Sequence, residues 1–216
     1  MKHWTRKILE TTVVLTALSG IILTLLSSGK TENFCELAAE MLRLLFFFTI
    51  DSSIFVLILF GFRILSGKYT GIISAHSVIS GAVTINILVT GIVFFLLLRS
   101  FESQFGPLLY AGNMMLHYIL PVLCFYYFMI YAKEEKISFA YIGYWIIFPS
   151  LYFLVTLVRG AITGKYPYPF LNANTLGYPK VLVNSLLILI FIIILSIAII
   201  LLNRLIHKIY LRYKPK

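Results

Sequence analysis

Polar side chains inside long apolar stretches are the residues of this sequence that could do chemistry. His117 stands in the segment Leu116–His117–Tyr118–Ile119–Leu120–Pro121. Burying a polar group in hydrocarbon is costly, so such residues often mark a functional site. An imidazole can take and return a proton, which suits general acid/base catalysis. The other interpretation is that His117 hydrogen-bonds to a neighbouring helix and only holds the helices together.

The surroundings of His117 follow from its expected helix. Asn113, His117, Pro121 and Cys124 recur at spacings of four, four and three residues, so on an α-helix they share one face. If this helix starts near Leu108, His117 lies about nine residues in, or roughly 14 Å at 1.5 Å per residue. Asn113 therefore joins His117 as a candidate polar residue of the same site.

Thr49 is the second candidate, and it is expected at a similar depth. It lies about eight residues from Met41, where another apolar stretch begins, and so roughly 12 Å deep. Ser52 and Ser53 follow three and four residues later, on the same helix face. Taken alone, an intramembrane threonine usually bonds back to a carbonyl one turn earlier, and that interpretation stays open here.

Asp51 is the only carboxylate in the middle of an apolar stretch. It is two residues from Thr49 and therefore about 200° round the helix, which argues against its orienting His117 beside Thr49. We expect it to pair with another helix or to be partly protonated. The sequence has no HExxH motif, no Cys/His ligand spacing, no clustered carboxylates and no glycine-rich phosphate loop, so it predicts no metal site and no cofactor.

The elements that position these residues follow from composition. Of the 216 residues, 60% are apolar and only 12% are charged, which excludes both a water-soluble domain and a disordered chain. The mean hydropathy is +0.95. A helix needs roughly 20 mostly apolar residues to cross about 30 Å of hydrocarbon. We predict an all-α polytopic membrane protein, a single domain over residues 1–216, with six transmembrane helices near 8–26, 41–62, 77–98, 108–132, 138–158 and 181–202.

The basic residues predict how the chain is oriented. The first apolar stretch continues to Leu26, longer than the core of a signal peptide, so we expect it to be retained. With a cytoplasmic N-terminus, twelve of the 18 Lys and Arg residues fall on the cytoplasmic side. This bias favours a multi-pass protein of the cell membrane with both termini in the cytoplasm. The net charge of +10 then reflects orientation and anionic headgroups rather than nucleic acid.

The loop before the last stretch carries a stiff aromatic segment. Arg159–Gly160 is followed by Tyr166–Pro167–Tyr168–Pro169–Phe170. The alternating prolines fix φ and keep the preceding residues extended. Tyrosines favour the headgroup level, so the segment is either an interfacial anchor or a lid over an opening to lipid. In the second case Arg159, Tyr166, Tyr168 and Phe170 would bind substrate, with Arg159 available to a carboxylate or phosphate.

Three patches together resemble the androgen-induced and androgen-dependent membrane protein family, including its bacterial relatives. The patches are Phe47–Phe48–Thr49 with Ser52; Leu116–His117–Tyr118 with Pro121; and Arg159–Gly160–Ala161, Tyr166 through Leu171 and Gly177–Tyr178. They occur in the family's order and cover most of the chain from the second stretch to the sixth. The tyrosine–proline run is the most specific of the three.

The resemblance implies a six-span membrane protein. For the animal members it implies hydrolysis of fatty acid esters of hydroxy fatty acids by a threonine nucleophile with a histidine partner. These roles would fall on Thr49 and His117, with Ser52, Ser53 or Asn113 as donors to the oxyanion. This chain departs from the bacterial pattern in two places, since Ser52–Ser53 stands where Ser-Asn is frequent and Asn172 where Asp is frequent.

A non-catalytic membrane protein is the competing interpretation. In a carrier, His117, Asn113 and Asp51 would line a polar path, and in a lipid-binding scaffold they would hold helices together. A carrier needs polar groups in both leaflets. The inner half of the third stretch supplies Ser74, His76, Ser77 and Ser80, so the sequence alone keeps this alternative open.

Overall fold

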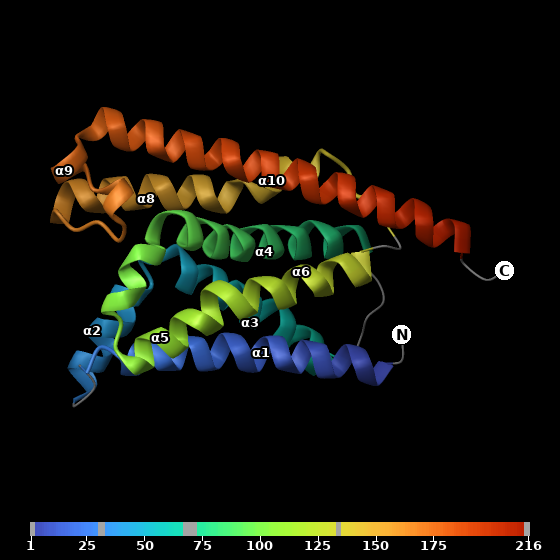
Figure 1. Ribbon diagram of the computed structural model, residues 1–216, viewed down its shortest axis with the longest axis horizontal. Helices are drawn as coiled ribbons and strands as arrows, with labels where there is room; N and C mark the ends of the chain where they lie inside the picture. Colours follow the sequence, from blue (N-terminus) through green and yellow to red (C-terminus); the bar gives the residue numbers. More distant parts are fainter. Residues whose placement is uncertain (1–2, 30–32, 67–72, 133–134, 214–216) are drawn as a thin grey trace. The chain divides into compact units, whose positions relative to one another are not determined.

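The described residues of the chain are mostly helical (Figure 1). The computed structural model describes residues 3–29, 33–66, 73–132 and 135–213, except for the side chains of residues 3 and 73–76. Within these residues there is no β-strand. Several residues used in the orientation and carrier arguments lie outside this part, namely Lys2, Lys30, Lys68, Lys133, Lys214 and Lys216, with the side chains of Ser74 and His76.

Among the described residues, six helical segments are long and apolar enough to cross a membrane. They are Trp4–Leu26, Phe48–Ser66, Ser77–Gln104, Pro107–Tyr131, Tyr141–Thr163 and Tyr178–Tyr213. The prediction of an all-α, six-span membrane protein is thereby confirmed. The segments are built from these elements: α1 (His3–Leu26), α3 (Phe48–Ser66), α4 (Ile73–Val93), η1 (Phe94–Leu98), η2 (Arg99–Gln104), α5 (Pro107–Asn113), η3 (Met114–Ile119), α6 (Leu120–Tyr131), α7 (Tyr141–Trp145), α8 (Ile147–Thr163) and α10 (Tyr178–Tyr213).

The second span begins later than predicted, at Phe48 instead of Met41. A separate helix, α2 (Phe34–Leu44), precedes it, and Asn33 caps α2 by accepting a hydrogen bond from the backbone N–H of Glu36 at 2.9 Å. The chain then turns, and the N–H of Phe47 donates to the carbonyl of Leu44 at 2.9 Å. The residues of this turn are as apolar as the helix that follows, so hydropathy does not reveal the break.

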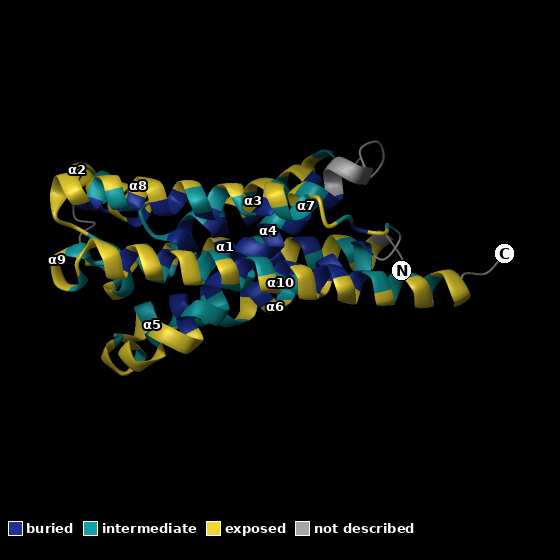
Figure 2. Ribbon diagram, turned by 90° about the horizontal axis from the view of Figure 1, so that it is seen from above, coloured by how far each residue is buried: buried dark blue, intermediate teal, exposed yellow. Residues whose placement is uncertain are grey.

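Contacts divide the chain into two compact units, residues 1–131 and 132–216. Whether the two act as one membrane domain stays a prediction. In the first unit α1, α3, α4 and the helix from α5 to α6 pack around a shared apolar core of Val13, Ala17, Ile50, Val56, Phe60, Leu116, Leu120, Cys124 and Tyr127, among others. The buried faces of these helices point inward in Figure 2, while exposed residues face outward as expected for lipid-facing positions.

Small residues bring α1 close to the helix that carries His117. A Cβ at Gly20 would lie 2.4 Å from a methyl group of Leu116. A Cβ at Gly112 would lie 2.8 Å from the hydroxyl of Thr24 and 3.1 Å from the carbonyl of Gly20. Glycines allow such close backbone approach in membrane helices, where van der Waals packing drives association.

In the second unit, Asn203 on α10 fixes the segment that leads into α7. Its Nδ2 donates to the carbonyl of Ala132 at 2.8 Å, and its Oδ1 accepts from the N–H of Ile137 at 3.2 Å. At the other end of the unit lie η5 (Pro169–Leu171) and the short α9 (Ala173–Leu176). The Phe170 carbonyl accepts from Asn184 Nδ2 at 2.8 Å, which ties this loop to α10.

Candidate functional site

Thr49 and His117 lie in direct contact. The hydroxyl oxygen Oγ1 of Thr49 is 3.0 Å from Nε2 of His117, within hydrogen-bonding distance. Thr49 is in the first turn of α3 and is 7% exposed, whereas His117 lies in η3 and is half-buried. A contact between residues so far apart in sequence depends on the packing of the two helices. The Thr49 hydroxyl therefore has a side-chain partner from another helix. A hydrogen bond only to a backbone carbonyl one turn earlier, the other interpretation of Thr49, does not account for this contact.

The two residues meet although the depth estimate for Thr49 started from the wrong helix end. Thr49 is the second residue of α3, while His117 lies ten residues after Pro107, where the fourth span begins. The depth counted for Thr49 from Met41 matched the depth counted for His117 only because α2 and the turn after it were taken as part of the second span. The agreement in depth therefore comes from helices that start at different levels, and residue counting from the sequence cannot establish it.

His117 lies in a π-helical segment instead of a regular α-helix. Over η3 the N–H of Leu120 donates to the carbonyl of Met115, five residues earlier. Pro121 supplies a local reason, because it has no N–H to donate to the carbonyl of His117 four residues before it. π-Helical segments are rare in proteins overall, and those that occur are often found at functional sites. The predicted shared α-helical face of Asn113, His117, Pro121 and Cys124 is therefore interrupted.

Gly91 on α4 makes room for this segment. A Cβ at Gly91 would lie 2.6 Å from the carbonyl oxygen of His117 and 3.1 Å from Cγ of Pro121. The carbonyl oxygen that Pro121 leaves without an N–H thus lies where a side chain at position 91 would begin, and only glycine leaves this space open. Close packing of α4 against η3 fixes the backbone on which the imidazole sits.

Phe94 covers the imidazole of His117. Its ring centroid lies 4.3 Å from that of His117 at an interplanar angle of 34°, and 6.0 Å from that of Tyr118 in an edge-on arrangement. Phe94 opens η1, a second π-helical segment, and is 4% exposed. The Nδ1 atom of His117 is buried and makes no hydrogen bond of ordinary geometry to a described residue. The ring is therefore held by packing, with Nε2 directed to Thr49.

The serines after Thr49 differ in what their hydroxyls do. Ser53 Oγ donates to the carbonyl of Thr49 at 2.7 Å, so it is already used by the helix. Ser52 Oγ is buried and has no hydrogen-bond partner in the described part of the chain. The side chain of Asp51 makes no hydrogen bond or ion pair to a described residue, His117 included; only its backbone N–H is bonded, to the carbonyl of Phe47 at 3.2 Å. Ser52 is therefore the nearest hydroxyl in sequence that can still donate to a bound molecule.

Asn113 binds a carboxylate that sequence reasoning did not single out. Its Nδ2 donates to Oε1 of Glu102 at 2.8 Å, and the hydroxyl of Tyr118 donates to Oε2 at 3.3 Å. Glu102 lies in η2, which the sequence analysis treated as a loop outside the membrane. In the sequence, Glu102 is marked only by its position between the predicted spans 77–98 and 108–132. Hydropathy gives no reason to place it near His117.

Arg159, Tyr166, Tyr168 and Phe170 belong to the second unit. The ring of Tyr166 packs on Gly160, where a Cβ would lie 1.9 Å from a ring carbon. The rings of Tyr168 and Phe170 stack with centroids 5.2 Å apart and planes 4° from parallel. The contact of Tyr166 holds the loop against Gly160 of α8, and the substrate-binding role of the four residues stays a prediction.

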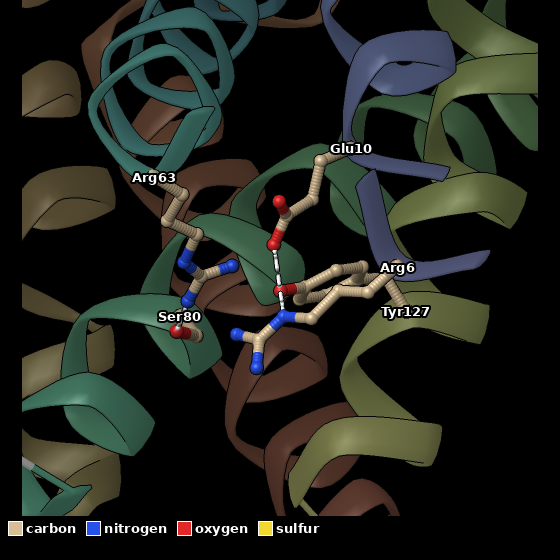
Figure 3. A network of polar contacts seen from close by, with 5 residues as sticks. All are labelled: Arg6, Glu10, Arg63, Ser80 and Tyr127. Carbon is tan, nitrogen blue, oxygen red and sulfur yellow. Dashed lines mark hydrogen bonds and ion pairs between the residues drawn. The ribbon is translucent and has the colours of Figure 1, made fainter. Parts of the chain in front are cut away.

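A second polar cluster in the first unit was also missed (Figure 3). The Tyr127 hydroxyl donates to Oε1 of Glu10 at 2.5 Å and accepts from Nε of Arg6 at 3.1 Å, and Arg6 also pairs with Glu10 at 3.1 Å. Beside it, Arg63 Nη2 donates to Ser80 Oγ at 2.5 Å and its guanidinium lies 5.0 Å from the Tyr127 ring. Arg6 and Arg63 are two of the twelve basic residues predicted on the cytoplasmic side, and the sequence does not indicate that Arg63 is buried, with 5% exposed.

Comparison with protein-family models, with curated proteins and with solved structures gives no match. The resemblance to the androgen-induced family therefore stays a prediction that rests on the residues quoted for it. The chain is a multi-pass helical membrane protein in which the hydroxyl of Thr49 contacts the ring of His117.

Proposed function

We propose that this protein is a membrane-embedded hydrolase of lipid esters, with Thr49 as the nucleophile and His117 as the general base. The observation that carries the proposal is the 3.0 Å contact between Thr49 Oγ1 and His117 Nε2. A threonine hydroxyl is a weak nucleophile and requires a base within about 3 Å. The burial of Thr49, at 7% exposure, favours reaction with a lipid ester over reaction with a water-soluble one.

The proposed reaction proceeds through an acyl-threonine. His117 Nε2 takes the proton of Thr49 while Oγ1 attacks the ester carbonyl, and the protonated ring then gives that proton to the departing alkoxide. Water, deprotonated by His117, releases the fatty acid and restores the hydroxyl. Negative charge on the carbonyl oxygen is stabilised by the hydroxyl of Ser52 and by the dipole of α3, which favours an anion at the N-terminal end of that helix. The chemistry needs no metal and no cofactor.

The substrate class comes from the resemblance. It implies fatty acid esters of hydroxy fatty acids, reached laterally from the lipid phase. With six spans both termini lie on one side, and the basic bias of the sequence favours the cytoplasm of a cell membrane for that side. Thr49 then lies toward the outer leaflet.

Turnover of a lipid ester by purified protein in nanodiscs tests the proposal. Thr49→Ala should lower kcat on the order of 10³-fold or more, and His117→Ala by about 10²–10⁴-fold. Thr90→Ala and His207→Ala are matched controls; the Thr90 hydroxyl is also buried but bonds to the carbonyl of Ile87 at 2.7 Å. Mass spectrometry should find an acyl group on Thr49 when the deacylation step is slow. Full turnover in both Thr49→Ala and His117→Ala would exclude this nucleophile and base.

A carrier is the second candidate, and one observation favours it. Polar side chains of α4 are buried along most of its length, namely Ser77, Ser80, Thr84, Asn86 and Thr90. With Thr49 and His117 near one end of the unit and Arg63 bound to Ser80 near the other, polar groups span its thickness. Flux of a labelled fatty acid into proteoliposomes, with no acylation of Thr49, would support the carrier. Neither flux nor turnover would indicate a lipid-binding scaffold.

A further inference from the structure

Glu102 receives one hydrogen bond at each end of the π-helical segment that carries His117. Asn113, just before η3, donates to Oε1 at 2.8 Å, and Tyr118, just after His117, donates to Oε2 at 3.3 Å. Asn113 is 4% exposed, so its amide needs a partner within the protein. A bidentate carboxylate is a specific partner, since its two oxygens fix two donors at once.

The spacing of these two donors depends on the π-helix. Asn113 and Tyr118 are five residues apart, and on an α-helix such residues point about 140° away from each other. In a π-helix the fifth residue instead completes the turn, because its N–H bonds to the carbonyl five residues earlier. Both side chains can therefore reach one carboxylate only in the π register. The Glu102 contacts thus stabilise that register over the α-helical one.

The same register directs the imidazole. His117 lies between the two anchored residues, its ring is covered by Phe94 at 4.3 Å, and its carbonyl is directed toward Gly91. Phe94 and Glu102 are on the continuous segment of η1 and η2. One stretch of chain therefore supplies both the packing surface for the ring and the anchor for its backbone. A change from π to α register would turn His117 relative to Thr49 on α3.

We propose that Glu102 is a positioning residue, which holds η3 in the π register through Asn113 and Tyr118 and thereby aims His117 Nε2 at Thr49 Oγ1. Glu102 makes no hydrogen bond to Thr49 or His117, so it acts through the backbone of η3 and takes no part in proton transfer. The catalytic consequence rests on the proposed hydrolase function. The geometric consequence does not, and it is tested separately.

The reactivity of Thr49→Cys reports the position of His117 without any substrate. A thiol beside an imidazole forms the reactive thiolate more readily, so iodoacetamide should alkylate Thr49→Cys faster than Thr49→Cys/His117→Ala, by at least about tenfold at neutral pH. Cys35→Ser serves as the background because Cys35 is exposed, whereas Cys124 is buried. The full chain is used in nanodiscs, and circular dichroism verifies folding of each variant.

Glu102→Ala should remove most of this His117-dependent acceleration. Glu102→Gln keeps an oxygen for Asn113 and should keep part of it, and Tyr118→Phe should cause a smaller loss. Glu135→Ala is the matched control, because Glu135 likewise accepts from a tyrosine hydroxyl, that of Tyr141 at 3.3 Å. An acceleration that survives intact in Glu102→Ala would overturn the proposal, as would the absence of any dependence on His117.

Ester turnover then separates the two proposals. If both hold, Glu102→Ala lowers kcat about 10²-fold with little change in KM, because a shift of about 1 Å at a reacting group has that effect. If the chain is not a hydrolase, no variant turns over substrate, yet alkylation of Thr49→Cys still depends on Glu102. If Glu102 does not position the ring, turnover in Glu102→Ala matches that of Glu135→Ala.

Discussion

Two buried polar sites of the first unit use their hydrogen-bonding groups differently. At one end, Arg6, Glu10 and Tyr127 form a closed set in which each side chain contacts the other two. At the other, one contact joins Thr49 to His117. Beside that contact, the buried Ser52 Oγ has no hydrogen-bond partner among the described residues, and His117 Nδ1 makes no hydrogen bond of ordinary geometry to them.

The difference separates a site that stabilises the fold from one that can receive another molecule. A buried polar set that is mutually bonded gives rigidity, and removing one member leaves the others unsatisfied in a low dielectric. Neither Thr49 nor His117 has to be charged, and the hydroxyl of Ser52 beside them is still available to hydrogen-bond another molecule. Substitutions in the first set should therefore act on stability, and substitutions around the pair on chemistry.

The largest effect on stability is expected at Glu10. Glu10→Ala leaves Arg6 and the Tyr127 hydroxyl without their carboxylate, and breaking a buried ion pair costs about 3–5 kcal/mol of unfolding free energy. Denaturation of the purified protein in mixed micelles measures the loss. Glu36→Ala, at an exposed position of α2, should change stability by less than about 0.5 kcal/mol. Equal stability of the two variants would contradict the assignment of a structural role to the cluster.

Tyr127→Phe should have a smaller effect of the same kind. It removes a hydroxyl bonded to two charged groups but leaves the Arg6–Glu10 pair, so we expect a loss of about 1.5–3 kcal/mol. Turnover per folded molecule should be unchanged. Tyr126→Phe is the control, since Tyr126 is the neighbouring residue and is 54% exposed. A loss of turnover without loss of stability would place this cluster in the reaction instead.

Gly91→Ala tests the packing that shapes the His117 segment. The added Cβ meets the His117 carbonyl at 2.6 Å and the Pro121 ring at 3.1 Å, neither of which can move aside alone. We expect a loss of about 1–3 kcal/mol in stability and a larger proportional loss of turnover. Gly61→Ala on α3 is matched, because nothing lies within 4 Å of its Cβ position. If both variants keep full turnover, α4 does not hold the imidazole in place.

The fold was predictable from the sequence to the extent that it depends on apolar length. Six spans follow from composition. The contact between Thr49 and His117 was expected from a similar depth, but that depth was counted from Met41 and not from Phe48, where α3 begins. The turn after Leu44 was not predictable, because its residues are as apolar as a helix. The π-helical segment was not predictable, because a proline such as Pro121 by itself indicates only a kink. Its register depends also on the close packing of Gly91 and, as proposed, on Glu102, which both lie in other segments. Glu10 was missed because it lies near a span end.

The smallest effect on stability is expected at Ser52, and it is the most informative one for the chemistry. Its hydroxyl is buried without a hydrogen-bond partner among the described residues, so Ser52→Ala removes an unsatisfied group and should leave the free energy of unfolding unchanged or slightly higher. If that hydroxyl stabilises the oxyanion, turnover falls about 10²-fold, as for the loss of one such donor. Ser196→Ala is the control, because the Ser196 hydroxyl is buried but bonds to the carbonyl of Ile192 at 2.7 Å. A stable variant with reduced turnover would show that Ser52 is kept for reaction at the expense of stability, whereas a stable variant with full turnover would remove Ser52 from the mechanism and leave the dipole of α3 as the proposed stabilisation of the oxyanion.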